Sequence, residues 1–470
     1  MSNNIITTKK DIVWNYIALF FNMGAGVIVL PLILHYLTAE EIGLNYLMLT
    51  ISSMVALIDF GFAPQIGRNI TYALSGANRV EREGLHDQAS VEPNFRLLAI
   101  VIEGAKYIYR RLSMVVLILM LTLGTYYIHY VTHGFKDVDN TLWIWIVFCV
   151  SNYFNIYFIY YRSLLTGSGK IYESSVSIIL SKLTYIIVCG VLAIYGFGLV
   201  SIVAANMLAP LVLFLYSHKI FYTPELIKKI PVDIQKDEIK EAISGIWYNA
   251  KKLGINSLGS FAILKLNVFL VGLFLPLPIV GSFGILTQVI PTLSSVATAL
   301  FHSYQPQIAS LQVRHDKVAI TKKLSLTVVV YWLTMVLGGI ALILLLPWVL
   351  KIIGSNAAIP PMYISILYLF VMILEGNHTI FATVIVTSNR VPFVSAGLIS
   401  GALIGVLMFL SLKFTTLDLF GVVLAQGVVQ LAYNNWKWPK YVLNDLKISP
   451  VAFVQQGNMR LCSIIKKLTK

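Results

Sequence analysis

Residues 42–77 read IGLNYLMLTISSMVALIDFGFAPQIGRNITYALSGA, and the architecture of the whole chain can be worked out from the pattern in this stretch. Its first part, residues 42–60, is apolar and carries a single charge, Asp59, near its end. A helix needs about 20 predominantly apolar residues to cross a bilayer. The stretch therefore predicts one membrane span, and Gly61 and Pro64 directly after it predict a break in the helix.

Apolar runs of similar length recur along the chain. The other predicted spans are 12–34, 112–131, 141–165, 174–195, 199–217, 253–275, 281–304, 324–346, 361–386, 393–412 and 419–436. Of the 470 residues, 57% are hydrophobic and only 12% are charged, whereas soluble domains carry about 25% charged residues. The sequence therefore predicts an all-α polytopic membrane protein with twelve transmembrane helices.

The positions of the cations predict how the chain is oriented. Of the 35 Lys and Arg residues, 30 lie in the termini and in alternate connecting segments, and only Lys136, Lys351 and Lys413 lie in the other connections. Because cytoplasmic loops retain Lys and Arg, both termini are predicted to be cytoplasmic. The net charge of +14 is then a consequence of topology. No nucleic-acid partner is expected, since the cations are scattered and form no recognisable binding module.

Sequence matches six spans apart indicate an internal duplication. Asn15 and Asn22 after Trp14 match Asn249 and Asn256 after Trp247, and residues 63–66 match residues 305–308. Transporters are often built from such repeats. The matches predict two six-helix bundles related by a pseudo-two-fold axis around a central cavity. The predicted domains are 1–217 for the first bundle, 218–252 for a cytoplasmic linker, 253–436 for the second bundle and 437–470 for a basic cytoplasmic tail.

Two lysines fall inside predicted spans. Charge within a span is costly, and it indicates a cavity or pathway unless the side chain reaches the interface. Lys265 lies near the middle of its span, so we expect it either to face the cavity and bind an anionic group or to form a structural pair. Lys182 is nearer to the inner end of its span, where a lysine can extend to the interface.

Glu375 and His378 lie three residues apart in the tenth predicted span, and therefore on one helical face. One interpretation is a protonatable pair that couples transport to an ion gradient. The other is an internal hydrogen-bonded pair. A di-iron site would need a second Glu-x-x-His motif, and the sequence has none.

Asp59 and Arg68 flank the break predicted after residue 60. They form either a gate or head-group contact, or an ordinary helix cap at the cytoplasmic end of the span. No cofactor, metal site or catalytic residue is predicted, because the three cysteines have neither disulfide nor metal-ligand spacing. The predicted external loops are short and leave no room for a catalytic domain, so we do not expect an enzyme.

The run from Asp59 to Ala77, the Gly43 opening of the second span, the Pro-Gln-Ile echo at 306–308 and the twelve predicted spans resemble the O-unit (Wzx-type) flippases of bacterial polysaccharide synthesis. These belong to the multidrug/oligosaccharidyl-lipid/polysaccharide exporter superfamily. The resemblance implies two six-helix bundles that move an undecaprenyl-pyrophosphate-linked oligosaccharide to the outer leaflet by alternating access. It implies that Lys265 and Arg68 meet the pyrophosphate or acidic sugars, and that Glu375 couples an ion.

The predicted function is therefore a lipid-linked oligosaccharide flippase of the bacterial inner membrane, acting as a monomer beside polysaccharide polymerases and glycosyltransferases. The candidate substrate-binding residues are Lys265, Arg68, Asp59, Asn22 and Asn256, and the candidate ion-coupling residues are Glu375 and His378. The alternative is a drug or small-cation antiporter of the same superfamily, which would bind cations through acidic cavity residues. A membrane polymerase or glycosyltransferase is a third possibility that the short external loops argue against.

Overall fold

The computed structural model describes residues 9–80, 92–231, 233–313, 316–388 and 392–468. The regular secondary structure of these residues is helical, with no β-strand among them, which confirms the all-α prediction. The chain divides into two compact units, Met1–Leu258 and Gly259–Lys470.

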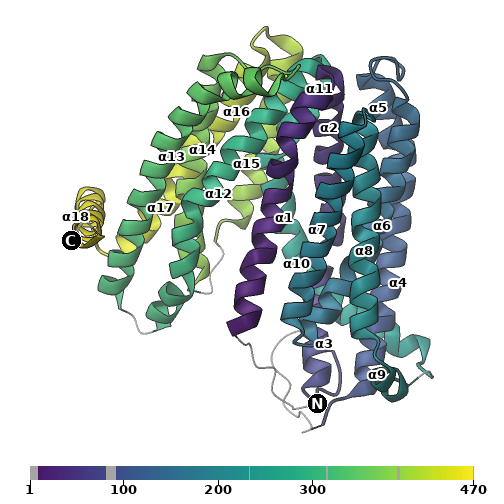
Figure 1. Ribbon diagram of the computed structural model, residues 1–470. Helices are drawn as coiled ribbons and strands as arrows, with labels where there is room; N and C mark the ends of the chain where they lie inside the picture. The colour runs from purple at the N-terminus through teal and green to yellow at the C-terminus, as the bar shows by residue number, and fades with distance from the viewer. Residues whose placement is uncertain (1–8, 81–91, 232, 314–315, 389–391, 469–470) are drawn as a thin grey trace. The chain divides into compact units, whose positions relative to one another are not determined.

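The first unit is built from long apolar helices. Its elements are α1 (Lys9–Tyr36), α2 (Ala39–Ala56), the short 3-10 turn η1 (Leu57–Asp59), α3 (Phe62–Leu74), α4 (Phe95–Leu119), the π turn η2 (Met120–Gly124), α5 (Thr125–Val131), α6 (Thr141–Gly167), α7 (Ile171–Ile194), α8 (Leu199–Phe221), α9 (Pro224–Lys229) and most of α10 (Lys236–Leu264). Helices α4, α6, α8, α7 and α1 pack as successive neighbours in this order (Figure 1).

The second unit contains the end of α10 and eight further helices. These are α11 (Leu266–Phe274), α12 (Leu277–Val313), α13 (Lys317–Ile353), α14 (Met362–Val386), α15 (Val394–Phe414), α16 (Asp418–Ala432), α17 (Asn434–Asp445) and α18 (Pro450–Leu468). Helix α14 is central, since it packs against α12, α13, α16 and α17.

Within the described residues, ten helical segments are long and apolar enough to cross a membrane, and each contains or overlaps a predicted span. The other two predicted spans are each divided by a break. Within 253–275 the helix ends at Leu264 and resumes at Leu266, and within 419–436 it ends at Ala432 and resumes at Asn434. Among the described residues, the remaining two predicted spans thus correspond to interrupted helices, with both breaks in the second unit. Such breaks are tolerated where protein or a cavity surrounds the freed backbone groups.

The segment predicted as a linker, 218–252, contains α9 and the first part of α10 and lies in the first unit. It is tied to α4 by an ion pair in which Arg96 Nε and Nη2 each lie 3.0 Å from a carboxylate oxygen of Glu238. Hydrogen bonds from the Arg96 guanidinium lower the pKa of this carboxyl group. The segment therefore packs on the bundle and is partly helical.

The second span ends where the sequence predicts a break. Phe60 and Gly61 both adopt left-handed conformations, with φ of 46° and 79°, and they separate η1 from α3. Glycine adopts this conformation without steric cost, whereas phenylalanine does so rarely. Helix α3 therefore starts in a new direction after Gly61.

Helices α3 and α6 approach each other closely at two glycines. A Cβ atom placed on Gly167 would lie 2.4 Å from the carbonyl oxygen of Gly67, closer than real contacts allow. The contact is reinforced by Thr71, whose hydroxyl donates to the Gly167 carbonyl at 2.8 Å. Small residues permit this packing between membrane helices because the backbones can nearly touch.

We predict that Gly167→Ala destabilises the protein by about 1–3 kcal/mol, because the added methyl group forces α3 and α6 apart. Gly67→Ala is the matched control, since its Cβ would have 3.6 Å to the nearest atom. Thermal unfolding in detergent gives the melting temperature of each purified variant. Equal melting temperatures for the two variants would contradict this account of the contact.

Candidate functional site

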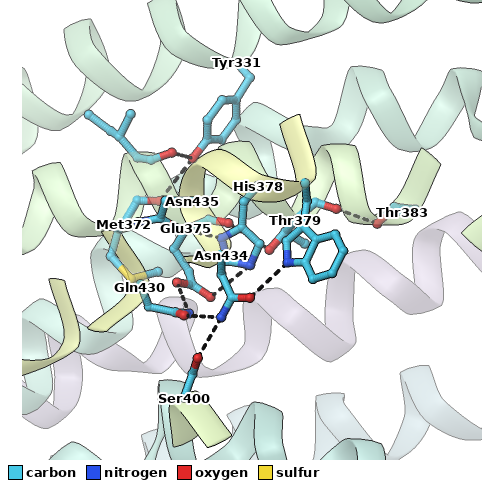
Figure 2. A network of polar contacts seen from close by, with 12 residues as sticks. Tyr331, Met372, Glu375, His378, Thr379, Thr383, Ser400, Gln430, Asn434 and Asn435 are labelled. Atoms are coloured by element: carbon cyan, nitrogen blue, oxygen red, sulfur yellow. Dashed lines mark hydrogen bonds and ion pairs between the residues drawn. The ribbon is translucent and has the colours of Figure 1, made fainter. Parts of the chain in front are cut away.

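A buried carboxylate, Glu375, lies at the centre of a polar network in the second unit (Figure 2). Its residue is 7% exposed, on the face of α14 that packs against the other helices. A carboxylate buried in an apolar bundle is costly unless hydrogen-bond donors surround it. Gln430 on α16 supplies one, with its Nε2 donating to Glu375 Oε2 at 2.7 Å.

The network continues from Gln430 through buried amide groups. Asn434 Nδ2 donates to Gln430 Oε1 at 2.7 Å and to Ser400 Oγ at 2.9 Å. Trp438 Nε1 donates to Asn434 Oδ1 at 2.9 Å. The chain of hydrogen bonds therefore connects α14, α15, α16 and α17, and it fixes the orientation of the Gln430 amide toward the carboxylate.

His378 lies on the other side of Glu375, as its position on the same helical face predicted. Its Nε2 is 3.7 Å from Glu375 Oε1, and its Nδ1 is 2.9 Å from Asn435 Oδ1. The Nδ2 of Asn435 is buried and has no hydrogen-bond partner among the described residues. With a carboxylate, an imidazole and an unsatisfied amide together, the network has the chemistry to accept or pass on a proton.

The side-chain amides that contact Glu375 and His378, those of Gln430 and Asn435, lie on the two sides of a helix break. Tyr433, between α16 and α17, has φ of −143° and ψ of −64°, and Asn434 and Asn435 follow it directly. Lys265 occupies the other break, between α10 and α11, with φ of −128° and an exposed side chain. Interrupted membrane helices are typical of substrate and ion sites in transporters.

The first unit has a pocket of about 500 Å³ with two arginines in its wall. It is lined by Ala63, Pro64, Gly67, Arg68, Thr71, Ile159, Arg162, Ser163, Thr166 and Gly167. The lining contains no acidic side chain, and neither guanidinium makes an ion pair with any residue that the structure describes. Two guanidinium groups without a neutralising acid in the lining are suited to a phosphate or other polyvalent anion.

The close packing of α3 on α6 brings the two arginines together. Arg68 follows Gly67 on α3, and Arg162 lies one turn before Thr166 on α6. The Ser163 hydroxyl donates to the Ala63 carbonyl at 2.8 Å, which fixes the register of the two helices. The arginines are 94 positions apart in sequence, and they share a pocket only because these helices touch.

Asp59 is held at a different place from Arg68. It accepts a hydrogen bond from the hydroxyl of Tyr109 on α4, and the Ala63 amide lies 3.5 Å from its other oxygen. Asp59 is absent from the lining of the arginine pocket. An Asp59–Arg68 gate is therefore not formed among the described residues, and Asp59 joins the end of the second span to α4.

The predicted site residue Asn22 lies on α1, which packs against α7. Asp11 accepts from the amide of Tyr172 at 3.0 Å, and Ala18 packs against Ile178 and Ile179. The same register places Asn22, which is exposed, at the level of Lys182. Lys182 is the twelfth of the 24 residues of α7, deeper than the predicted span boundaries implied.

Asn256 lies within α10, but its side chain is outside those that the structure describes. Arg162 is the functional candidate that the sequence did not single out. The sequence analysis counted it among the cations that orient the chain, because it lies at the cytoplasmic end of a span. No local motif distinguishes it from the other cytoplasmic lysines and arginines.

No protein-family model and no curated protein matches the chain at the sequence level. Solved structures do match its fold. A lipid II flippase, MurJ, in an inward closed conformation has a TM-score of 0.65 and 15% identity, over 97% of this chain and 93% of the flippase. An inward-facing multidrug resistance MATE family transporter of the MOP superfamily has a TM-score of 0.61 and 13% identity, over 93% of this chain and 99% of the transporter.

A Vibrio cholerae MATE transporter also matches, with a TM-score of 0.54 and 13% identity, over 93% of this chain and 97% of the transporter. The chain therefore has the multi-span membrane fold that MATE transporters and the lipid II flippase share. At these identities the likeness is one of fold, and the substrate must be argued from the residues of the site.

We predict that Gln430→Leu destabilises the protein by about 1–3 kcal/mol, because it removes a hydrogen bond from a buried carboxylate. Thr379→Val is the control, since the Thr379 hydroxyl donates only to the backbone carbonyl of Glu375 within its own helix. Melting temperatures in detergent provide the comparison. A Gln430→Leu variant as stable as the control would show that the network contributes no stability.

Proposed function

We propose that the protein is a flippase for lipid-linked oligosaccharides, which moves undecaprenyl-pyrophosphate-linked sugar units from the cytoplasmic to the outer leaflet by alternating access. The observation that carries this proposal is the pocket of about 500 Å³ that Arg68 and Arg162 both line, without a neutralising acid in the lining. A pyrophosphate group presents several anionic oxygens, and a pair of arginines can bind them by charge-assisted hydrogen bonds.

The physical task fits a membrane fold of this kind. The polar head of such a substrate must cross about 30 Å of hydrocarbon, whereas its lipid tail stays in the bilayer. Residues that bind the phosphates and sugars must then line a polar path. Lys265 at the helix break, and Asn22 with Lys182 on α1 and α7, are the further candidates for this path.

The proposal includes the setting of the protein. We place it in the bacterial cytoplasmic membrane with both termini inside, as a monomer without cofactor or catalytic activity of its own. Polysaccharide polymerases and glycosyltransferases would act before and after it on the same lipid-linked sugars. The excess of cations in alternate connections supports this orientation.

We expect Arg68→Ala combined with Arg162→Ala to slow flipping by about tenfold or more, since a hydrogen bond to a charged group contributes about 1.5–3 kcal/mol. The assay uses the purified protein in liposomes with a fluorescently labelled undecaprenyl-pyrophosphate oligosaccharide, whose exposed fraction is bleached by dithionite. Arg110→Ala is the control, because Arg110 is an exposed cation outside the pocket.

The results of this assay test the role of the arginine pocket and the flippase activity separately. Flipping by the double variant at the rate of the unmodified protein would remove the arginine pocket from the mechanism. Absence of flipping by the unmodified protein, with labelled substrates of several sugar compositions, would contradict the flippase itself.

The Glu375 network favours a second candidate, an ion-coupled drug or small-cation antiporter. A buried carboxylate beside an imidazole can bind a cation or proton, and such groups within membrane helices commonly serve ion pathways. In this case the transported molecule would be a cation, and the arginine pocket would have no role in binding it.

Proton coupling through Glu375, in either candidate, predicts that Glu375→Gln abolishes the dependence of transport on a pH gradient, because the amide cannot take up or release the proton. Transport by reconstituted vesicles is measured with and without an imposed gradient, using the labelled lipid-linked sugar and a cationic dye in parallel. Thr379→Val, one turn away on α14, serves as the control. Unchanged gradient dependence in Glu375→Gln would exclude proton coupling through this residue.

A further inference from the structure

The last helix of the chain, α18, has an apolar stripe that is longer than the protein surface covering it. Phe453, Gly457, Leu461 and Ile464 follow at spacings of three and four residues and so share one face. Phe453 is 2% exposed and lies against Phe381, with 5.9 Å between ring centroids. Farther along, Ile464 and the adjacent Ile465 are 40% and 50% exposed. The protein therefore covers only the first half of the stripe.

Gly457 fixes where α18 crosses α13. A Cβ atom on this glycine would lie 2.5 Å from the carbonyl oxygen of Ser325 and 2.6 Å from Val329 Cγ2. The two helices therefore touch backbone to backbone at Ser325, and the Val329 side chain packs beside this contact. Helix α18 is seen nearly end-on in Figure 1 where α13 is seen along its length, so the two lie crosswise.

The crossing lies at the place where α13 changes from charged to apolar. Lys317, Lys322 and Lys323 occupy its first two turns, and residues 324–350 carry no charge. An uncharged helical stretch of that length exceeds the about 30 Å of a hydrocarbon core. Ser325, which directly follows the charged turns, therefore lies near the boundary between the polar and apolar layers of the membrane, and a helix crosswise at that level lies close to the boundary plane.

The charges of this segment have one sign. Residues 446–470 contain Lys447, Arg460, Lys466, Lys467 and Lys470 and no Asp or Glu. Arg460 and Lys466 are both exposed, on either side of Ile464 and Ile465. An amphipathic helix with exposed apolar side chains and only positive charge is complementary to a membrane surface that carries anionic head groups.

We propose that α18 is an interfacial helix that binds anionic lipid head groups, with Ile464 and Ile465 inserted among the acyl chains and Arg460 and Lys466 at the phosphates. The first half of its stripe attaches it to α13 through Gly457 and to Phe381 of α14 through Phe453, and the second half attaches the same end of α13 to the bilayer. This lipid site is independent of the arginine pocket and of the substrate that the protein transports.

The thiol of Cys462 provides a direct probe, because it is exposed on α18 whereas Cys149 and Cys189 are buried. The full-length protein is labelled there with an environment-sensitive dye and placed in nanodiscs of phosphatidylcholine, or of phosphatidylcholine with phosphatidylglycerol. Quenching by acrylamide reports exposure to water, and this neutral quencher is not concentrated or depleted by surface charge.

We expect quenching at least about twofold weaker in the anionic nanodiscs, with a blue-shifted emission, and reversal of both at high salt. Arg460→Gln with Lys466→Gln should remove the difference between the two lipids. The control, Lys219→Gln with Lys228→Gln, removes the same charge from exposed positions of the first unit and should keep it. Equal quenching in both lipids, or an equal loss in the two double variants, would overturn the proposal.

Discussion

The cost of leaving a polar group without a partner in hydrocarbon shapes every part of this protein. Backbone amides and carbonyls must be satisfied inside the helices, and a side-chain charge needs either a protein partner or access to water. Most of the chain meets this condition by being helical, apolar and uncharged across the spans. A few places in the spans contain helix breaks or charged side chains instead. These places indicate function, because a protein contact, water or a ligand must satisfy the polar groups there.

In the second unit these departures cluster. The helix is interrupted at Tyr433, and the two asparagines that follow turn toward Gln430 and His378 around the buried carboxylate of Glu375 (Figure 2). Asn434 and Asn435 are the first two residues of α17, so the break at Tyr433 determines the direction in which that helix begins and where the two amides lie. The break and the network thus belong together, and the position of Lys265 at the other break marks it as a second place where polar groups interrupt the apolar layer.

In the first unit, the charged side chains of this kind are two arginines. Arg68 and Arg162 share a pocket because α3 and α6 meet at Gly67 and Gly167, where Gly167 has no Cβ to keep its helix away from the Gly67 carbonyl. The glycines thereby determine the chemistry of the pocket, although they contribute no polar side chain to it. Asp59, which precedes the same helix, is held by Tyr109 of α4 and leaves the arginines without a neutralising partner in the pocket lining.

The sequence by itself determined the helical class, the segments that cross the membrane and the pairing of Glu375 with His378, because hydropathy and helical periodicity act over a few neighbouring residues. It also predicted the break after Asp59 from Gly61. It did not reveal the breaks at Lys265 and Tyr433, since neither glycine nor proline marks them. Only the tertiary structure decided that Arg162 joins Arg68, that Gln430 and Asn435 reach the Glu375–His378 pair, and that Asp59 turns to Tyr109. These contacts join residues 50 to 94 positions apart, and their geometry depends on how helices pack, which no local pattern encodes.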